Sequence, residues 1–405
     1  MRIFNQMFRA ATLAIAISGL AAVEGRAQEQ EPIKIGELNS YNRFAAFSVP
    51  YRNGWQMAIE EINAAGGVLG GRKIEVVSRD DGATTGDAVR VAEELISREE
   101  VAFLFGTFLS NVGLAVGDFA NQRKTLFIAA EPLSDALTME KGNRYTYRVR
   151  PNTYMLTKML VEAGKDLGKK RWAIVVPNYE YGQAAANAFK QLAPDAIEDF
   201  EIVVEQYPAL GKIDAGATVS AIEEAKPDAI FSALFGGDLA KFVREGTTRG
   251  LFEDREVLSL LTGEPEWLIP LADEAPEGWI VTGYPWDQVE GEAHAKFIAD
   301  YQAKFNETPR LGSLLGYQVG NLIKAMLEKA GSTDTEAMLA ALEDLEFDAV
   351  VGPAIMRGID NQATVGIWVG RIAVEGRVGK MIDWTYADGA DYMFPEDAVR
   401  AARSD

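Results

Sequence analysis

Ser110 is the residue whose type and position most clearly permit chemistry. It follows an expected strand over Val101–Phe105 and precedes an expected helix over Asn111–Ala120. A serine at such a position commonly caps the helix, because its side-chain oxygen accepts a backbone N–H. The same hydroxyl, together with the free N–H groups of a helix N-terminus, also forms an anion-binding site. The sequence leaves both roles open.

A group of aromatic residues forms the second candidate feature, because each lies just after an expected strand. Rings in such loops often pack two lobes together, and that is one interpretation. Where the loops converge on one cleft, the rings instead favour a stacked, partly apolar ligand. The seven residues are Phe44, Phe47, Tyr179, Tyr181, Phe235, Tyr284 and Trp286.

The composition excludes most catalytic and metal-binding chemistry. The 405 residues include no Cys and a single His, His294, which we expect at the surface or at a helix cap. Without Cys there is no thiol catalysis, disulfide scaffold or Cys-ligated metal, and one His argues against a His-based triad. The net charge of −20 argues against nucleic acid, because binding to phosphates needs clustered Lys and Arg. We therefore expect no enzyme activity, no cofactor, no metal and no nucleic-acid partner.

Alternating strands and helices must position these residues. Such alternation predicts parallel sheets with helices on both faces. The expected strands cover 33–38, 73–78, 101–105, 125–129 and 145–149 in a first unit, and 172–176, 201–206, 228–234, 257–261 and 279–284 in a second. The expected helices cover 51–65, 85–98, 181–192, 219–225, 239–248, 294–305, 315–329 and 335–345, and a final β-rich part covers 354–384.

Ligands of open α/β sheets bind beyond the carboxyl ends of the strands. Two such units that face each other would therefore bury a small molecule at their interface. The positions that follow strands include Ala130 in the first unit, and Thr262 and Tyr284 in the second. We expect these residues to lie close to the ligand.

Residues 1–27 have the layout of a secretory signal peptide. Arg2 and Arg9 make the start positive, residues 10–23 are almost wholly apolar, and Gly25-Arg26-Ala27 offers small residues for cleavage. The apolar run is too short for a membrane-spanning helix. We therefore expect a protein that is exported to the periplasm.

Several motifs resemble the leucine/isoleucine/valine-binding family of periplasmic solute-binding proteins of ABC importers. The most specific is the run Asn53-Gly54-Trp-Gln-Met-Ala-Ile-Glu-Glu-Ile-Asn-Ala-Ala-Gly-Gly-Val68, which follows Ile33-Lys-Ile-Gly36. The others are Asp80-Asp81 with Asp87-Ala88-Val89, Gly106…Ser110, Ala136-Leu-Thr138, Tyr181-Gly182-Gln183, Glu277-Gly278, Ala330-Gly-Ser-Thr333 and Gly352-Pro353. The resemblance covers nearly the whole chain after the signal peptide.

The resemblance implies an α/β fold of two doubly wound, Rossmann-like lobes joined by three crossing segments, the type I periplasmic-binding fold. The crossings would fall near Val149–Asn152, Ile280–Gly283 and Val350–Pro353. Lobe 1 would contain residues 28–150 and 281–351, and lobe 2 residues 151–280 and 352–405. Such lobes close on a small-molecule ligand like a hinged clamp. The implied protein is a monomer, and its partners are ABC permease subunits in the inner membrane.

The resemblance also implies roles for individual residues. Ser110 and the neighbouring backbone would hold a ligand carboxylate. Tyr181 would close on the ligand from lobe 2. Phe47 would cover the ligand, and Phe235 falls near a further pocket position.

Two departures from the family pattern change the expected ligand. Glu131 opens a loop that typically reads Ser/Ala-Ala-Thr, and Leu261 stands where the family has an acid for the ligand ammonium. Glu264 lies three positions on and would substitute only if the loop shifts. If Glu131 faces the cleft, the ligand carries an amine or amide; if it pairs with Arg148 or Arg150, an aromatic or other organic carboxylate fits. We favour an amino-acid-like or amide ligand, but not leucine, isoleucine or valine.

Three functions compete at this stage. The first is a solute receptor that delivers ligand to an ABC importer. The second is a secreted hydrolase, for which the sequence offers no evident nucleophile–base pair. The third is a sensory subunit of the same fold that signals to a membrane partner. We expect the importer receptor, with the sensory subunit as the alternative.

Overall fold

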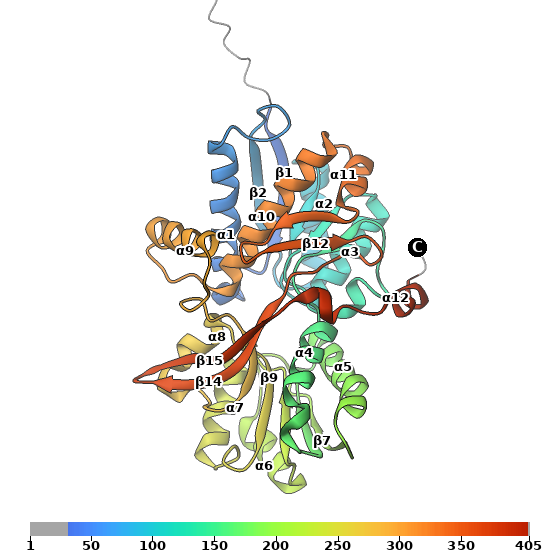
Figure 1. Ribbon diagram of the computed structural model, residues 1–405. Helices are drawn as coiled ribbons and strands as arrows, with labels where there is room; N and C mark the ends of the chain where they lie inside the picture. The colour runs from blue at the N-terminus through green and yellow to red at the C-terminus, as the bar shows by residue number, and fades with distance from the viewer. Residues whose placement is uncertain (1–30, 404–405) are drawn as a thin grey trace, which may run out of the picture.

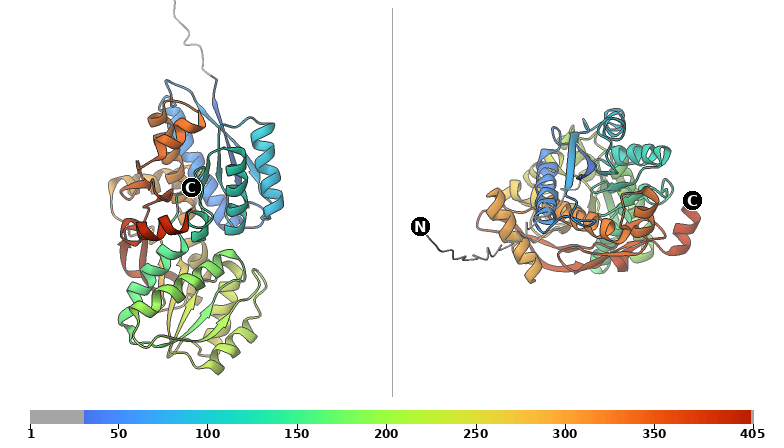
Figure 2. Two further views of the ribbon diagram at one scale, coloured as in Figure 1. Left: turned by 90° about the vertical axis from the view of Figure 1, so that its right-hand side faces the viewer. Right: turned by 90° about the horizontal axis from the view of Figure 1, so that it is seen from above.

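Two β-sheets, one in each lobe, organise the chain (Figure 1). The computed structural model describes residues 31–403, so the expected signal peptide over 1–27 lies outside the described residues. The first sheet has eight strands in the order β11-β12-β13-β5-β4-β3-β1-β2, and the second has seven in the order β15-β14-β10-β9-β8-β6-β7. The expected α/β fold of two lobes is confirmed. Figure 2 shows the lobes stacked along the long axis of the molecule.

Lobe 1 begins with five parallel strands and the helices that cover them. Strands β1, β3, β4 and β5 are buried along almost their whole length, as expected for a parallel sheet with helices on both faces. The elements are β1 (Ile33–Asn39), α1 (Ala45–Ala64), β2 (Ile74–Asp80), α2 (Thr85–Ser97), β3 (Leu104–Gly106), α3 (Ser110–Arg123), β4 (Phe127–Ala129), η1 (Asp135–Leu137) and β5 (Thr146–Arg148).

Lobe 2 repeats this arrangement with a second set of parallel strands. The chain enters it after β5, at the first crossing, in the region where we expected it. The elements are α4 (Thr153–Gly164), η2 (Lys165–Leu167), β6 (Arg171–Val175), α5 (Glu180–Ala196), β7 (Glu201–Gln206), α6 (Ala215–Ala225), β8 (Ala229–Ser232), α7 (Gly236–Thr248), β9 (Glu256–Gly263), α8 (Pro265–Leu271), η3 (Ala272–Glu274) and β10 (Ile280–Gly283).

The second and third crossings lie later than the sequence indicated. Residues 280–283 form β10, which pairs with β9 inside lobe 2, so the chain leaves lobe 2 only after Gly283. Gly352-Pro353 does not leave lobe 1, because Pro353 starts β12, which pairs with β11 in an antiparallel hairpin. The expected crossing near Val350–Pro353 is therefore wrong, and the chain crosses between Ala363 and Ile367.

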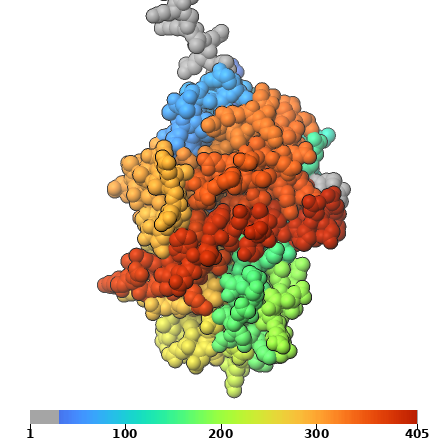
Figure 3. Space-filling view, in the orientation of Figure 1, coloured from blue at the N-terminus to red at the C-terminus, as the bar shows by residue number. Residues whose placement is uncertain are grey.

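The last third of the chain completes both lobes. Its lobe 1 elements are α9 (Glu292–Phe305), α10 (Leu311–Ala330), α11 (Thr335–Leu342), β11 (Leu345–Asp348), β12 (Pro353–Arg357) and β13 (Gln362–Ala363). The antiparallel pair β14 (Ile367–Glu375) and β15 (Val378–Ala387) then extends the lobe 2 sheet, followed by η4 (Gly389–Tyr392) and α12 (Glu396–Ala402). In the space-filling view this final red segment lies across the junction of the lobes (Figure 3). No helix in residues 31–403 is long and apolar enough to span a membrane.

Helices α1 and α10 pack closely in lobe 1 because small residues line their contact. Gly312, Gly316 and Gly320 recur every four residues and so share one face of α10. A Cβ on Gly316 would overlap the carbonyl oxygen of Tyr51, and a Cβ on Gly320 would overlap the Cβ of Ala58. This close approach fixes the N-terminus of α10 beside the cleft.

A buried carboxyl on β1 forms the polar interior of lobe 1. Glu37 is fully buried, and its Oε2 accepts a hydrogen bond of 2.6 Å from the Ser78 hydroxyl. Burial raises the pKa of Glu37 to about 8, although the Ser78 bond acts in the opposite direction. Two residues further along β1, Asn39 donates a hydrogen bond to the side chain of Glu131. The same strand thus carries a protonatable core residue and a residue that holds Glu131.

We predict that Gly316→Ala destabilises the protein by about 1–3 kcal/mol, because the added methyl overpacks a backbone contact. The control is Gly86→Ala on α2, where a Cβ meets no atom within 4 Å. There we expect about 0.4–1 kcal/mol of added stability from the reduced freedom of the unfolded chain. Urea unfolding measures both. A Gly316→Ala variant as stable as the wild type would contradict the packing argument.

We predict that Glu37→Gln changes how stability depends on pH. The folded-state pKa is raised, so between about pH 4.5 and 8 the folded protein keeps a proton that the unfolded chain has lost. This contribution stabilises the wild type at low pH and disappears as pH rises, with a slope of at most about 1.4 kcal/mol per pH unit. Urea unfolding at several pH values should show that the free energy of unfolding of Glu37→Gln rises relative to that of the wild type as the pH approaches 8.

Glu75→Gln is the matched control for this experiment, because Glu75 lies exposed on the neighbouring strand β2. We expect its difference from the wild type to stay constant over the same range. A constant difference for Glu37→Gln as well would show that Glu37 titrates normally.

Candidate functional site

A cavity lies between the lobes, where the carboxyl ends of strands from both sheets meet. Its free volume is about 20 Å³, enough for about one water molecule. The lobes are therefore closed, and a ligand needs them to separate or the side chains to move. The lining residues are Phe47, Phe108, Ser110, Glu131 and Leu133 of lobe 1, Arg150 of the first crossing, and Tyr179, Tyr181, Phe235, Leu261, Glu264 and Trp267 of lobe 2.

A larger groove of about 590 Å³ opens outside this cavity. Phe235 and Trp267 line both spaces and so separate them. Three residues that line the inner cavity, Glu131, Arg150 and Tyr181, each carry a buried polar atom without a partner in residues 31–403, and no residue that lines the groove alone does so. We therefore place the candidate site there and regard the groove as the mouth of the cleft.

Ser110 is the first residue of α3 and lies in the cavity wall. Its Oγ accepts the backbone N–H groups of Leu133 (3.2 Å) and Ser134 (3.1 Å). The N-cap position belongs to Leu109, which offers no side-chain bond, so of the two roles left open for Ser110 the structure does not support capping of α3. The Ser110 hydroxyl can still donate its proton, and the first N–H groups of α3 lack intrahelical partners. Both features suit an anionic group.

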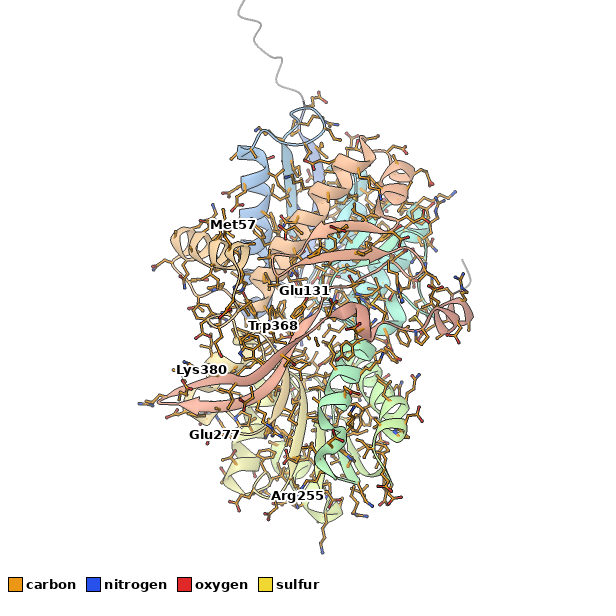
Figure 4. The ribbon with its side chains drawn as sticks, viewed as in Figure 1. Met57, Glu131, Arg255, Glu277, Trp368 and Lys380 are labelled. Carbon is orange, nitrogen blue, oxygen red and sulfur yellow. The ribbon has the colours of Figure 1, made fainter. Side chains whose placement is uncertain are left out.

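Glu131 faces the cavity from the end of β4, at the level of the junction in Figure 4. Its Oε1 accepts a hydrogen bond of 2.7 Å from Nδ2 of Asn39, while its buried Oε2 has no partner within residues 31–403. Burial raises the pKa of Glu131 well above its ordinary value, opposed by the Asn39 bond and the charge of Arg150. Glu131 pairs with neither arginine: Arg148 donates to Gln362 in lobe 1, and Arg150 binds another acid.

Arg150 and Glu264 form a buried ion pair in the cavity wall. The Arg150 guanidinium also lies 4.9 Å from the centre of the Phe47 ring, and its Nε is buried without a partner in the described part of the chain. Burial raises the pKa of Glu264, and the adjacent Arg150 guanidinium opposes this by stabilising the ionised carboxylate. The cleft therefore contains a cation that is already matched by an acid.

A turn at Leu261 brings Glu264 into the cavity. Leu261 has a φ of 68°, in the left-handed region that few non-glycine residues adopt. The Glu264 N–H then donates to the Leu261 carbonyl over 2.9 Å, which closes the turn. This turn is the loop arrangement that Glu264 needs in order to reach the cleft.

Tyr181 enters the cavity from the start of α5. The preceding loop turns sharply, and a Cβ on Gly182 would overlap the Pro177 carbonyl oxygen, so glycine is required there. The Tyr181 hydroxyl is buried with no partner among residues 31–403. Its ring lies 6.0 Å from that of Phe235.

The remaining rings interlock across the cleft. Phe108 of lobe 1 lies 6.2 Å from Phe235 of lobe 2, and Phe47 stacks on Trp267 at 6.4 Å. The Ser134 hydroxyl adds a hydrogen bond of 2.7 Å to Glu180 across the same junction. These contacts close the lobes on an aromatic interior.

Three expected site residues lie outside the cavity. The Ala130 N–H donates to the Gly106 carbonyl over 2.9 Å within the lobe 1 sheet. Thr262 shares a hydrogen bond of 2.7 Å with Ser259. Tyr284 packs against Trp368, so its ring does not line the cleft.

His294 is buried, and the expected surface or capping role is wrong. It is 1% exposed, and its Nε2 lies 2.6 Å from the Tyr284 hydroxyl. Burial lowers the pKa of His294. The pair packs lobe 2 against α9. Within residues 31–403 no group of His, Asp and Glu side chains has the arrangement of a metal site.

Trp267 and Arg150 line the cavity but were not expected there from the sequence, whereas Phe108 belongs to the loop over 106–111 that follows an expected strand at the cleft. Phe108 lies two residues before Ser110 in the same loop after a strand. Trp267 follows Glu264 by three residues at the start of α8, a spacing that puts two side chains on one face. Both spacings are visible in the sequence, whereas the pairing of Arg150 with Glu264 joins positions 114 residues apart.

Comparison with known proteins agrees with this fold. Residues 32–377 match the family described as Periplasmic binding protein. The Leu/Ile/Val-binding protein homolog 7 of Brucella suis is 27% identical over 353 residues, which cover 83% of this chain and 86% of that protein.

Two solved structures have the same fold. The closed leucine-, isoleucine-, valine-, threonine- and alanine-binding protein of Brucella ovis has a TM-score of 0.80 at 22% identity, covering 90% of this chain and 97% of that one. An ABC transporter solute-binding protein of Rhodopseudomonas palustris in complex with 3,4-dihydroxybenzoic acid has a TM-score of 0.79 at 22% identity, covering 88% and 98%. The chain therefore belongs to the Leu/Ile/Val-binding family of non-enzymatic periplasmic solute-binding proteins of ABC transporters.

Proposed function

We propose that the protein captures a small solute in the cleft between its lobes and delivers it to the permease subunits of an ABC importer. It does so as a monomer in the periplasm, after removal of the signal peptide over residues 1–27. Family membership supports the transport role. The chemistry of the cleft supports the choice of ligand.

Three unpartnered polar atoms carry this proposal. Oε2 of Glu131, Nε of Arg150 and the Tyr181 hydroxyl are all buried, and all belong to residues that line the one cavity. Leaving such an atom without a partner costs about 1–3 kcal/mol, and native proteins contain few of them. The three residues belong to lobe 1, the first crossing and lobe 2. A ligand that bonds all three would therefore hold the lobes together.

The arrangement favours an amino-acid-like or amide ligand. The Ser110 hydroxyl, the start of α3 and Tyr181 all offer donors, which suit a carboxylate or a carbonyl oxygen. Once Glu131 is ionised, its Oε2 accepts a hydrogen bond, and a ligand ammonium or amide N–H supplies the donor. The rings of Phe47, Phe108 and Phe235 suit an apolar body. Leucine, isoleucine and valine are poor candidates, because Leu261 replaces the acid that the family uses for their ammonium group.

An aromatic carboxylate is the second candidate, and the interlocked rings favour it. A flat ring stacks between aromatic side chains at little entropic cost. Its carboxylate would meet Ser110 and Nε of Arg150, and a ring hydroxyl would donate to Glu131. The Rhodopseudomonas palustris protein of the same fold was solved with 3,4-dihydroxybenzoic acid.

Calorimetric titration with three ligand sets tests the proposal. The sets are the three branched aliphatic amino acids, a series of amides and other amino acids, and hydroxylated benzoates. We expect the tightest binding in the second set, with a smaller radius of gyration at saturation and the ligand recovered unchanged. Tightest binding in the third set would select the aromatic candidate. Submicromolar affinity for leucine, or turnover of the ligand, would contradict the proposal.

We predict that Ser110→Ala and Tyr181→Phe each weaken ligand binding tenfold to a hundredfold. Each removes a hydrogen bond to a charged group, which contributes about 1.5–3 kcal/mol. The melting temperature of the empty protein should change little in Tyr181→Phe, because that hydroxyl has no partner among residues 31–403. It should fall in Ser110→Ala, because the buried N–H groups of Leu133 and Ser134 lose their acceptor. The control is Tyr207→Phe, since that hydroxyl bonds Glu205 on the outer face of lobe 2. Wild-type affinity in both site variants would show that the site is assigned wrongly.

A further inference from the structure

We propose that Glu266 is a positioning residue for ligand capture, because its carboxylate on lobe 2 holds the lobes closed by capping helix α10 of lobe 1. The inference rests on the proposed function, since it explains how the clamp stays closed. Glu266 does not line the inner cavity. It lines the outer groove alone, so its effect on a ligand held in the inner cavity is exerted through the position of the lobes.

The contact consists of two hydrogen bonds to the first turn of α10. Oε1 of Glu266 accepts the Gly312 N–H over 2.7 Å, and Oε2 accepts the Leu311 N–H over 3.3 Å. The first N–H groups of a helix have no partner inside the helix, and the helix dipole favours a negative charge beside them. The carboxylate thus satisfies two donors that otherwise need water.

The contact joins residues of different lobes that are not neighbours along the chain. Glu266 stands on α8, which follows β9 in lobe 2, whereas α10 packs on α1 in lobe 1. The second crossing lies between them in sequence. When the lobes separate, both the carboxylate and the two N–H groups must be hydrated again. The two hydrogen bonds therefore belong to the closed form alone.

The surroundings of Glu266 are shaped for this contact. Glu266 is 1% exposed, and a Cβ on Gly312 would lie 2.8 Å from the Phe47 carbonyl oxygen and 3.2 Å from Oε1 of Glu266. A side chain at position 312 would therefore push the carboxylate away. Burial raises the pKa of Glu266, whereas the Gly312 N–H and the charges of Arg310 and Arg150 act in the opposite direction and favour the ionised form.

The same turn connects this contact to the ligand site. Glu264 and Trp267 flank Glu266 in sequence, and both line the inner cavity. Nε1 of Trp267 donates to Oε2 of Glu264 over 3.2 Å, which ties the turn together. A ligand that orders Glu264 and Trp267 thereby places Glu266 against α10.

Distance measurements between the lobes test the proposal without any ligand. Because the chain contains no Cys, Ala46→Cys and Lys241→Cys introduce two unique sites for nitroxide labels. Both positions are exposed, one on α1 of lobe 1 and one on α7 of lobe 2. Pulsed electron–electron double resonance then gives the proportion of closed and open forms.

We expect the labelled protein to show a short, closed distance and a long, open one. Glu266→Ala should lower the ratio of closed to open forms tenfold to a hundredfold. Glu266→Gln should give an intermediate ratio, since its one amide oxygen still accepts one N–H. The control Glu274→Gln, which breaks a surface pair of lobe 2 with Arg244, should match the reference protein. An unchanged ratio in Glu266→Ala, or a reference protein with the long distance alone, would overturn the proposal.

A second variant removes the donor instead of the acceptor. Leu311→Pro deletes the N–H at the first position of α10, where proline is well tolerated. Arg310 has φ −125° and ψ 173°, the extended conformation favoured before proline. Leu311→Ala controls for the loss of the leucine side chain. If Glu266→Ala fails to fold, these two variants still test whether the hydrogen bond to α10 stabilises the closed form.

The comparison of single and double variants separates the cap from general loss of structure. Relative to Leu311→Ala, Leu311→Pro should lower the closed population when Glu266 is present and have no further effect in Glu266→Ala. Because Leu311 is buried in the core, both Leu311 variants should lower the melting temperature of the empty protein by similar amounts, so the two are compared with each other at a temperature where both are folded. Equal effects in both backgrounds would overturn the proposal. If none of the ligands in the calorimetric titration binds, that result counts against the proposed function. The distance measurements contain no ligand, so they test the role of Glu266 separately.

Discussion

The burial of three glutamates along the junction of the lobes is the constraint on which the closed structure depends. Glu131, Glu264 and Glu266 are each at most 1% exposed. A buried carboxylate is costly unless other groups replace the water it has lost. The replacements are the Asn39 amide, the Arg150 guanidinium and two N–H groups of α10. Two of the acids stand on lobe 2 and their donors do not, so the lobes close favourably only in the register that unites each acid with its partner.

The position of Glu264 determines which carboxyl group in the cleft is available to a ligand. The left-handed turn at Leu261 carries Glu264 into the cavity. There Glu264 already has Arg150 as its counter-charge. A paired carboxylate attracts a ligand ammonium less than an unpaired one does. Glu131, whose Oε2 has no partner in the described structure, is therefore the acid best placed to meet a ligand donor.

Local sequence patterns were sufficient for the order of strands and helices and for the residues at strand ends. Ser110 and Glu131 follow strands directly, so the rule on carboxyl ends places them at the cleft. Pairing between distant segments is not visible in such patterns. β12 and β13 join lobe 1, and Arg150 binds Glu264 and not Glu131, because long-range hydrogen bonds and charges decide between alternatives that periodicity does not distinguish.

The three crossings also determine when each lobe can form during synthesis. Helix α1 of lobe 1 packs on α10, and β5 pairs with β13, so lobe 1 stays incomplete until residues near 363 are available. The lobe 2 sheet needs β14 and β15, which end at Ala387. Neither lobe is a continuous stretch of chain, and contacts between such distant segments form slowly. A chain emerging from the ribosome thus keeps both sheets unfinished until β13 for lobe 1, and β14 and β15 for lobe 2, have been synthesised.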